Sequence, residues 1–444
     1  MLNGVMFNNN YPIIEKSNEL YNRALELIPS TTQTIAKGPS QYVNGIAPKY
    51  LIKGEGSHVW DADGNEYIDF NMGIGPISLG YNYRKINEAI INQLKDGITF
   101  SLMHPLEVEV AELISEIIPN AEMVKYSKTG ADVTSAAIRL ARAFTGKDKV
   151  LTCGYHGWHD WYANILPPNK GIPNVVSDLT HTFNYNDIDS LKNSIDDNTA
   201  AVILEPVVFE APKNNFLRDV YELCREKNVV LIFDEMWTGF RISLGGAQEY
   251  FDIKPDLATY SKAIANGMPL SVLTGRKEIM KLAENDIFFY TTFGGEALSL
   301  AAAKATIEEM WNKNVINYLN VQGKKIKDGF NALCELFDLE FITATGYNWR
   351  SLIKINDTYG DPLIIKSYIQ QEMIKRGILW SGFHNMSYSH SDKDINYTLS
   401  VYEDVLKNLK DVISTGNMKD KILGIPVQPV FRKIDNFNVK PVNK

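Results

Sequence analysis

The stretch VVLIFDEMWTGFRISLGGAQEYFDIKPDLATYSK, residues 229–262, decides the predicted fold. It opens with a continuous apolar run, which is typical of a strand buried on both faces. The run ends at Asp234 and Glu235, and two carboxylates at that point need partners because an uncompensated buried charge is costly. A second short apolar run, residues 257–260, is followed closely by Lys262. An acid and a lysine, each at the end of a core strand, can converge on one bound molecule.

Outward from this stretch, strand and helix patterns alternate from about residue 121. The candidate strands are short apolar runs at residues 123–126, 150–153, 200–204, 229–233, 257–260 and 270–274. Helical patterns separate several of them, for example at residues 133–144 and 215–227. Such alternation predicts an α/β fold with right-handed crossovers and a mostly parallel central sheet flanked by helices. Ligands of such sheets bind beyond the carboxyl ends of the strands.

The regions on both sides of this core predict a smaller α+β domain made from both chain ends. Near the start, Asp63-Gly64 between apolar residues favours a small antiparallel sheet. Beyond about residue 330 the pattern changes to half-exposed strands and two helices. The predicted segments are residues 1–75 (first part of the small domain), 76–325 (large ligand-binding domain), 326–415 (second part of the small domain) and 416–444 (an extension).

Composition restricts the class of protein. The 444 residues are 45% hydrophobic and 22% charged, which is typical of a soluble globular chain. The net charge of −8, with no clustered basic stripe, argues against a nucleic-acid partner. The three cysteines form no CxxC pair and suit a reducing cytoplasm. No signal peptide and no apolar run near the ~18 residues of a membrane helix is found, so we expect a cytoplasmic protein without a membrane segment.

The residues that follow the candidate strands are the informative ones. They are Ser127-Lys128-Thr129-Gly130, Gly154-Tyr155-His156, Glu205-Pro206, Asp234-Glu235 and Ser261-Lys262. The turn at Thr129 and Gly130 opens a helix whose free N–H groups could bind an anion, although a plain helix cap has the same pattern. Tyr155 could stack on a planar ligand or close the core. His156-x-x-His159-Asp160 could be a metal site, but its spacing is not a zinc signature, and we predict no metal.

Common nucleotide sites do not explain Asp234. A nucleotide hydrolase needs a GxxxxGK[ST] loop and a nicotinamide site needs G-x-G-x-x-G, and the sequence has neither. A protonated pyridine nitrogen remains as a fitting cation, because Asp234 beside it would keep the ring protonated and electron-withdrawing. Lys262 precedes small residues that leave room for a ligand, and a desolvated lysine becomes a nucleophile toward an aldehyde. The predicted cofactor is therefore pyridoxal 5′-phosphate.

Several ordered stretches together resemble the class III, fold-type I aminotransferases, and most closely their glutamate-1-semialdehyde 2,1-aminomutase branch. The resemblance covers about residues 15–413. The stretches are IRLARAFTGKDKV (138–150), GYHGWHD (154–160), LIFDEMWTGFR (231–241), PDLATYSKAIANGMPLSVLTG (255–275) and TTFGGEALSLAAAKA (291–305). Motifs in this order and at this spacing are far more specific than any one of them.

The resemblance implies roles around the cofactor ring. Lys262 is implied as the Schiff-base lysine and the proton shuttle, and Asp234 as the partner of the pyridine nitrogen. Met236 would pack on one face of the ring and Tyr155 would stack on the other, while Glu205 would orient the surroundings.

The resemblance also implies how the phosphate is held. Thr129, Gly130 and Ala131 would bind it from one subunit, and Thr292 would reach the phosphate of the partner subunit. The enzyme is accordingly expected to be a homodimer that acts on small amine and carbonyl substrates.

Departures from the aminomutase pattern favour another reaction. In the phosphate loop TGADV replaces the usual Ser-Gly-Thr-Glu-Ala, and NILPPNKGIP (164–173) replaces a glycine-rich loop. After Pro29, Lys37 stands at the offset of a substrate-binding arginine, and a lysine makes only a point contact. Arg350 is an alternative carboxylate clamp, and the region of His384 could also face the substrate. We predict transamination between two molecules; the alternatives are an intramolecular aminomutase and an inactive cofactor-fold binding protein.

Overall fold

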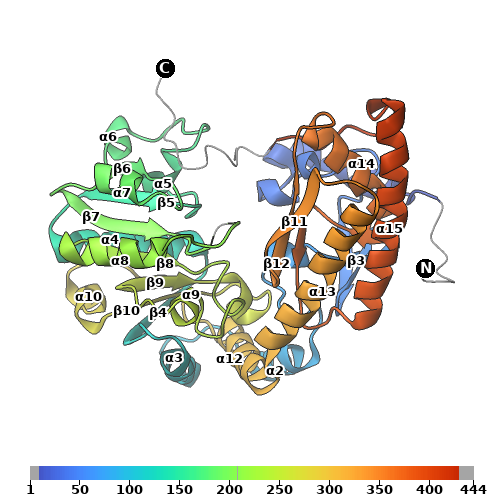
Figure 1. Cartoon of the computed structure of the whole chain (residues 1–444). Coiled ribbons are helices and arrows are strands. Elements are labelled where there is room, and N and C mark those ends of the chain that lie inside the picture. Colours follow the sequence, from blue (N-terminus) through green and yellow to red (C-terminus); the bar gives the residue numbers. More distant parts are fainter. Residues whose placement is uncertain (1–9, 208, 430–444) are drawn as a thin grey trace. The chain divides into compact units, whose positions relative to one another are not determined.

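The computed structural model describes residues 10–207 and 209–429, and the chain forms two compact units (Figure 1). The central unit contains residues 84–316, and the terminal unit contains residues 10–83 and 317–429. Both ends of the chain therefore contribute to the terminal unit. Each unit has its own sheets and its own buried core, and each is described by itself.

The central unit is built on a seven-stranded sheet with the order β4-β10-β9-β8-β7-β5-β6. Its strands are β4 (Met123–Ser127), β5 (Lys149–Cys153), β6 (Thr180–Thr182), β7 (Thr199–Leu204), β8 (Val230–Asp234), β9 (Leu257–Tyr260) and β10 (Ser271–Gly275). Only β10 runs antiparallel to its neighbours β4 and β9, and all other pairs are parallel. The predicted α/β fold with a mostly parallel sheet is thus confirmed.

Besides one-residue differences at other strand ends, two details of this sheet differ from the prediction. The edge strand β6 was not predicted, because Thr-His-Thr is short and polar and gives no apolar run. Strand β8 begins at Val230 and includes Asp234, one residue later than predicted, because the ladder with β9 continues as far as the pair Asp234 and Thr259. The acid is therefore part of the sheet rather than of the loop that follows.

Helices cover the central sheet and pack on each other beside it (Figure 1). They are α2 (Arg84–Asp96), α3 (Pro105–Ile117), α4 (Gly130–Thr145), α5 (Asp160–Ala163), α6 (Asn174–Ser177), α7 (Ile188–Ser194), α8 (Phe216–Glu226), α9 (Ala247–Tyr250), α10 (Lys277–Met280), α11 (Leu282–Asn285) and α12 (Ala297–Asn312). Helix α4 lies across β7 to β10, and α12 packs on α2 and α3. Small buried side chains such as Ala137 and Ala141 let α4 approach the strands closely.

The register of the sheet brings the strand ends together. Cys153 pairs with Leu204, Leu204 pairs with Phe233, and Asp234 pairs with Thr259. Because these strands are parallel, the residues that follow them emerge side by side at one edge. This edge, called the carboxyl edge below, carries most of the residues singled out in the sequence.

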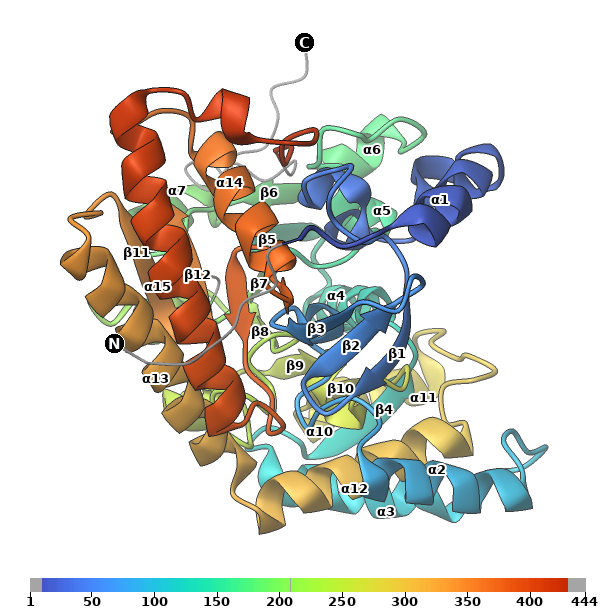
Figure 2. The same ribbon diagram turned by 90° about the vertical axis from the view of Figure 1, so that its right-hand side faces the viewer.

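The terminal unit contains two smaller sheets, with the orders β1-β2-β3-β13 and β11-β12-β14 (Figure 2). Their strands are β1 (Leu51–Glu55), β2 (His58–Asp61), β3 (Glu66–Asp69), β11 (Ile342–Tyr347), β12 (Arg350–Ile355), β13 (Ile378–Leu379) and β14 (Phe383–Asn385). The antiparallel sheet predicted around Asp63-Gly64 is present, and Gly64 takes the positive φ of +91° that its turn requires. Strand β13, from the second half of the chain, extends this sheet by pairing parallel with β3.

Four long helices complete the terminal unit. They are α1 (Glu15–Leu27), α13 (Val315–Leu336), α14 (Pro362–Lys375) and α15 (Asp392–Thr415). Helices α14 and α15 correspond to the two helices predicted beyond about residue 330, whereas α13 was not predicted. Within the described residues, no helix combines the length and the apolar run that are needed to cross a bilayer.

The segments at the two ends of the terminal unit meet. Residues 29–41 contain three short 3-10 turns. Of the predicted extension 416–444, residues 430–444 lie outside the described residues. In the described part, Ile425 forms a bridge with Asn44, where Asn44 N–H donates to Ile425 O at 3.0 Å. The start of the extension is therefore attached to the N-terminal segment.

Candidate active site

Asp234 lies at the carboxyl edge and is fully buried. Its Oδ2 accepts a hydrogen bond from His156 Nδ1 at 2.7 Å, and its Oδ1 accepts one from Met236 N at 3.0 Å. Within the described chain, no lysine or arginine forms an ion pair with it. A buried carboxylate that has an imidazole but no permanent cation can accept a further donor, so a ligand with a positively charged N–H fits this position.

His156, the hydrogen-bond donor to Asp234, lies in the loop that follows β5. Its carbonyl accepts from Thr134 Oγ1 at 2.8 Å, and its ring stacks near Trp161, with centroids 6.3 Å apart. Its Nε2 is buried and has no hydrogen-bond partner in the described chain. With Nδ1–H donating to Asp234, Nε2 is a bare acceptor, which costs less to bury than an unpaired N–H.

The alternative of a metal site on His156 and His159 is not supported by their contacts. His156 bonds Asp234, whereas His159 Nδ1 bonds Ser135 Oγ at 2.7 Å. In residues 10–207 and 209–429, no three His, Cys, Asp or Glu side chains are grouped to hold a metal ion.

Glu235, the second carboxylate after the apolar run, has a separate set of partners. It accepts hydrogen bonds from the hydroxyl of Thr238, from Ala247 N at 2.8 Å and from Gln248 N at 3.0 Å. Burial, together with the neighbouring charge of Asp234, raises the pKa of Glu235 to about 7. Glu235 thus ties residues 245–248 back to the end of β8 and is not directed at a ligand.

Lys262 is the first residue of a short 3-10 helix, Lys262–Ala265, which follows β9. Its backbone has φ +41°, a left-handed conformation that costs a non-glycine residue about 1–3 kcal/mol. Its Nζ lies 4.0 Å from the centre of the Trp237 ring. Since Trp237 follows Asp234 by three residues, the structure brings this lysine to the same short segment as the buried acid.

The start of α4 forms the next part of the site. Thr129 caps the helix: its Oγ1 accepts from Asp132 N at 3.3 Å, while Asp132 Oδ2 accepts from Thr129 N at 2.8 Å. The first N–H groups of a helix have no intrahelical acceptor and can bind an anion. A Cβ on Gly130 would lie only 3.0 Å from Met236 Sδ, so the turn and Met236 are in close contact.

The aromatic loop lies against the same turn. Gly157 has φ +107°, and a Cβ there would lie 2.7 Å from the Cβ of Ala131. Tyr155, which is half-buried, donates its backbone N–H to Glu205 Oε1 at 2.7 Å. A Cβ on Gly154 would lie 2.9 Å from Glu205 Cγ. The glycines therefore allow the loop, Glu205 and the helix start to approach each other as closely as they do.

Thr292 is placed differently. It is exposed on the loop before α12, and no hydrogen bond in the described chain joins it to the other predicted site residues. The same loop is attached to the end of β4 through Glu296, whose Oε1 lies 2.7 Å from Lys128 Nζ. Eight of the nine predicted site residues thus lie at the carboxyl edge, and Thr292 stands apart on the surface.

The candidate substrate residues of the terminal unit have different environments. Lys37 is exposed in a short 3-10 turn. Arg350 begins β12, with its guanidinium 5.0 Å from the Phe383 ring centre. His384 is buried between Ser351 and Tyr402, each 2.8 Å away, and burial lowers its pKa to about 3. His384 is therefore a neutral core histidine.

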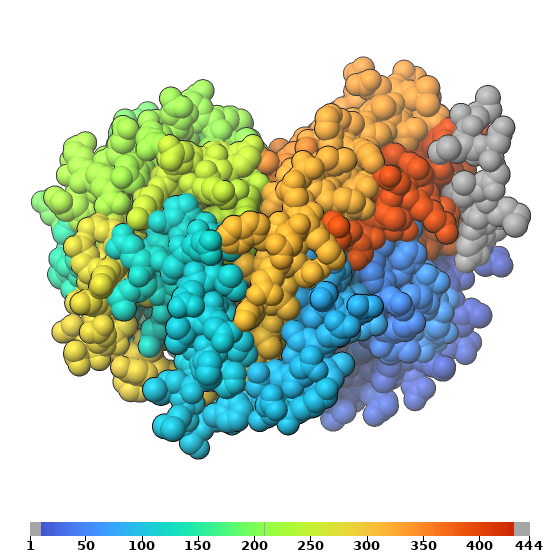
Figure 3. Space-filling view, turned by 90° about the horizontal axis from the view of Figure 1, so that it is seen from below, coloured from blue at the N-terminus to red at the C-terminus, as the bar shows by residue number. Residues whose placement is uncertain are grey.

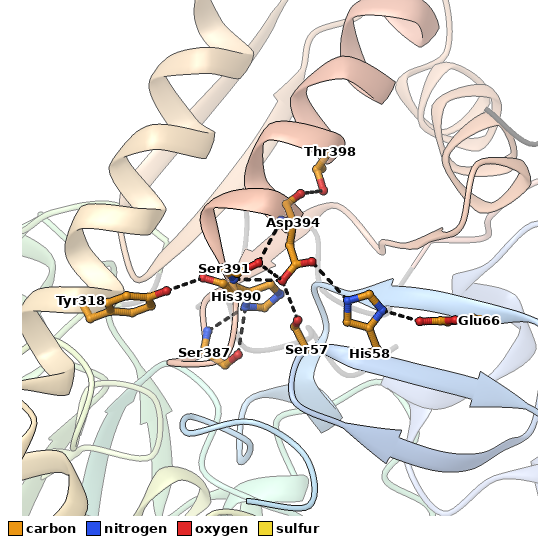
Figure 4. Close-up of polar contacts among 9 residues, drawn as sticks. All are labelled: Ser57, His58, Glu66, Tyr318, Ser387, His390, Ser391, Asp394 and Thr398. Carbon is orange, nitrogen blue, oxygen red and sulfur yellow. Dashed lines mark hydrogen bonds and ion pairs between the residues drawn. The ribbon is translucent and has the colours of Figure 1, made fainter. Parts of the chain in front are cut away.

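A second polar cluster lies in the terminal unit, around the start of α15 (Figure 4). Asp394 accepts from Ser57 Oγ at 2.9 Å, from Ser391 N at 2.9 Å and from His58 Nε2 at 3.2 Å. His58 Nδ1 lies 2.8 Å from Glu66 Oε1 on the other side. Although burial opposes it, these hydrogen bonds, led by that from His58, hold the pKa of Asp394 well below its usual range. The cluster caps α15 and fastens it to the β2–β3 hairpin.

Two contacts of the site were missed by the sequence reasoning. One is the His156–Asp234 hydrogen bond, and the other is the contact of Lys262 with Trp237. Both contacts had a weak indication in the sequence, since each of these residues stands within a few positions of a predicted strand end. To predict which residues would meet, the register of β5, β8 and β9 was needed.

Two protein-family models match the chain. A model described as aminotransferase class-III matches residues 43–344, and one described as allinase matches residues 355–427. The chain is 34% identical to a 3-aminobutyryl-CoA aminotransferase of Cloacimonas acidaminovorans, over 90% of this chain and 99% of the relative. It is 33% identical to a glutamate-1-semialdehyde 2,1-aminomutase of Archaeoglobus fulgidus, over 88% of this chain and all of that protein (100%).

Solved structures agree with these matches. The PLP internal aldimine form of the FumI protein of Sphingopyxis sp. MTA144 has a TM-score of 0.84 at 26% identity, covering 92% of this chain and 99% of that one. An omega-transaminase of Sphaerobacter thermophilus, at 23% identity, shares the fold with a TM-score of 0.80, covering 88% and 97% of the two chains. Pyridoxal 5′-phosphate also fits the buried, cation-free carboxylate and the adjacent lysine found here. The chain belongs to the class III aminotransferases, and its cofactor is pyridoxal 5′-phosphate.

Proposed function

We propose that this enzyme moves an amino group from a small amino donor to the aldehyde or ketone of a second molecule, with the cofactor held at the carboxyl edge. The observation that carries the site assignment is the buried Asp234, which has an imidazole but no lysine or arginine as an ion-pair partner in the described chain. When bound, pyridoxal phosphate supplies an electron-withdrawing ring that stabilises a carbanion at the substrate carbon.

Each residue at this edge has a proposed part. Asp234, oriented by His156, keeps the ring nitrogen protonated. Lys262 anchors the cofactor through its amine, takes the α-proton of the substrate and returns it to the cofactor carbon. Met236 and Tyr155 enclose the ring and exclude water.

The phosphate is proposed to bind at the start of α4. Thr129, Gly130 and Ala131 stand at the first turn of this 16-residue helix, where N–H groups and the helix dipole favour an anion. Glu205 fixes the aromatic loop by accepting from Tyr155 N.

Transfer between molecules is preferred over an internal amino shift because of the loop after Pro29. Lys37, at the position of the aminomutase arginine, is an exposed lysine and can make only a point contact with a carboxylate. The intramolecular aminomutase remains the second candidate, favoured by the aminomutase relatives.

A spectral experiment tests the proposal. The purified enzyme should show an absorbance band near the visible edge that Lys262→Ala abolishes and that Lys281→Ala, at an exposed lysine, leaves unchanged. An amino donor should then convert the band to that of the pyridoxamine form, and turnover should require an added 2-oxo acid or aldehyde. Turnover of an amino aldehyde without any acceptor would replace the proposal by the aminomutase. Absence of the band from the wild type would contradict the site.

The donor screen should begin with the chemistry of a relative. A similar protein is named for 3-aminobutyryl-CoA, so we propose a β-amino thioester and the free β-amino acid as the first pair of donors. Conversion of the band by the thioester alone would assign recognition to the thioester-linked part, and conversion by both would assign it to the β-amino group.

We also propose a homodimer in which Thr292 reaches the cofactor phosphate of the partner. Apolar side chains are exposed on the loop between α2 and α3, led by Leu102 (79% exposed) and Met103 (82%). Ala297 N donates to Ile98 O at 2.9 Å, which joins this loop to the segment that carries Thr292. Figure 3 views this part of the central unit, coloured blue to cyan. Exposed apolar patches of this kind support an interface.

Two further assignments stand as proposals. We infer that residues 76–325 act as the cofactor-binding domain, that residues 1–75 and 326–415 act as the small domain, and that residues 416–444 are an extension. We infer a cytoplasmic location, which the three buried free thiols support because such thiols suit a reducing compartment.

A further inference from the structure

Trp237 stands next to two cations of the central unit. Lys262 Nζ lies 4.0 Å from the centre of its ring, and Arg241 Cζ lies 5.3 Å from the same centre. Arg241 is buried, and its Nη1 donates to the carbonyl of Trp237 at 3.0 Å. The backbone of Trp237 is thereby held while its ring contacts the amine of Lys262.

The ring affects the two protonation states of this amine differently. The negative face of an indole attracts an ammonium group, more strongly when the pair is desolvated than when it is exposed, and a neutral amine lacks this attraction. Trp237 is half-buried, so its contact with Lys262 lies between these two cases. Trp237 therefore favours the charged form of Lys262.

We propose that Trp237 is a positioning residue. It holds the side-chain amine of Lys262 in its protonated form at the stage of the reaction when this amine is not bonded to the cofactor. The proposal rests on the proposed function, in which Lys262 is the proton shuttle. When the substrate C–H bond breaks, its electron pair stays with the carbon attached to the cofactor. The proton forms the third N–H bond of the amine, and Trp237 stabilises this ammonium until the proton is returned.

The consequence is a displaced pH profile. Removing the indole removes stabilisation from the ammonium only, so the amine loses its proton at a lower pH. For a cation–π contact of ordinary strength, the midpoint is displaced by about 0.4–1.5 pH units. At a pH below the midpoint the neutral fraction then rises about twofold to thirtyfold.

The midpoint can be measured without turnover. The enzyme is loaded with pyridoxamine phosphate, which leaves Lys262 as a free amine, and is labelled with trace acetic anhydride across a pH series. The Lys262 peptide is then quantified by mass spectrometry. The high-pH plateau of each variant corrects for access, so the midpoint reports protonation alone.

Two variants at Trp237 and one matched control are compared. Trp237→Leu should lower the midpoint by about 0.4–1.5 units, and Trp237→Phe, which keeps a weaker π face, should lower it less. The control is Trp60→Leu in the terminal unit, where Lys53 Nζ lies 4.3 Å from the Trp60 ring centre. It should leave the Lys262 midpoint unchanged.

An unchanged midpoint in Trp237→Leu, or equal shifts in the Phe and Leu variants, would overturn the proposal. If Trp237→Leu does not fold, an unshifted Trp237→Phe overturns it as well. These results are separate from the test of Lys262. If Lys262→Ala abolishes the absorbance band while Trp237 variants leave the midpoint in place, only the role of Trp237 is wrong.

Discussion

Asp234 is a buried carboxylate, and burial disfavours its negative charge. Its oxygens accept from His156 Nδ1 and Met236 N, and each donor reduces the cost of keeping the carboxylate buried. The acid could be picked out of the sequence because it ends an apolar run. Its histidine could not, because residues 78 positions apart become partners only through the pairing of strands.

Replacing His156 tests this support. His156→Phe keeps a buried ring but removes the donor, so the free energy of unfolding should fall by about 1–3 kcal/mol and the cofactor should dissociate faster. Thermal and urea unfolding measure the first effect, and loss of the absorbance band on dilution measures the second. His159→Phe, at a histidine bonded to Ser135, is the control for the cofactor effect. Wild-type cofactor retention in His156→Phe would contradict the assigned support.

His58 makes the terminal unit sensitive to pH. Its hydrogen bond with Asp394 and its contact with Glu66 raise the pKa of His58, because the charged ring is stabilised between two carboxylates. A raised pKa in the folded state means that the stabilisation is fully present below the unfolded value of about 6.5 and is lost as the pH rises through the folded value.

We predict that the stabilisation contributed by His58 decreases as the pH rises. The difference in unfolding midpoint in urea between wild type and His58→Gln should be largest near pH 6 and should shrink toward about pH 9. Both carboxylates remain ionised in this range, so only the charge of His58 changes. A gap that stays constant, or that widens with pH, would show that His58 contributes as a neutral group.

At the scale of elements, α13 shows what the hydrophobic pattern misses. Its buried side chains, Val315, Leu319, Ile326, Phe330 and Cys334, lie along one face, but two glycines and many polar residues interrupt the pattern. The glycines have a tertiary cause. A Cβ on Gly323 would lie 1.7 Å from Asn348 O, and one on Gly329 would lie 2.7 Å from Leu399 Cδ2.

The strand runs were easier to predict for a physical reason. Strand β7 is buried along its whole length and, after Thr199, consists of apolar residues, so its pattern is visible without any neighbour. The edge strand β6 is polar and is defined only by pairing with β5. Local sequence therefore predicts the centre of the sheet better than its edge.

Helix α4 allows a separation of two roles of Thr129. Thr129→Ala removes the cap and should lower the free energy of unfolding by about 1 kcal/mol with or without the cofactor. If the hydroxyl also binds the phosphate, as proposed, Thr129→Ala should in addition weaken cofactor affinity, and Thr129→Ser should restore both properties. Titration of the apoenzyme with pyridoxal phosphate measures the affinity. Unchanged affinity in Thr129→Ala would leave Thr129 as a helix cap alone.

At the scale of the whole molecule, the proposed dimer makes the site depend on a second copy. Sedimentation should show a dimer, and a charged pair at the exposed loop, Leu102→Glu with Met103→Glu, should yield monomers that lose the cofactor. Thr292→Ala should remain dimeric but bind the cofactor about 10- to 100-fold more weakly, because one hydrogen bond to a charged phosphate is lost. Leu336→Glu, at an exposed position of the terminal unit, is the control. A monomeric variant with wild-type cofactor affinity would contradict the shared site.

The α/β class, the mostly parallel sheet, the cofactor and the family could all be predicted from the sequence, because apolar runs and ordered motifs are local properties of the chain. Tertiary structure decided what depends on contact across the chain. The hydrogen bond between His156 and Asp234 and the contact of Lys262 with the Trp237 ring exist only in the folded chain. The same is true of the hydrogen bond from Ala247 N that gives Glu235 partners of its own. These contacts follow from strand register and close packing, and neither is visible until the strands have paired.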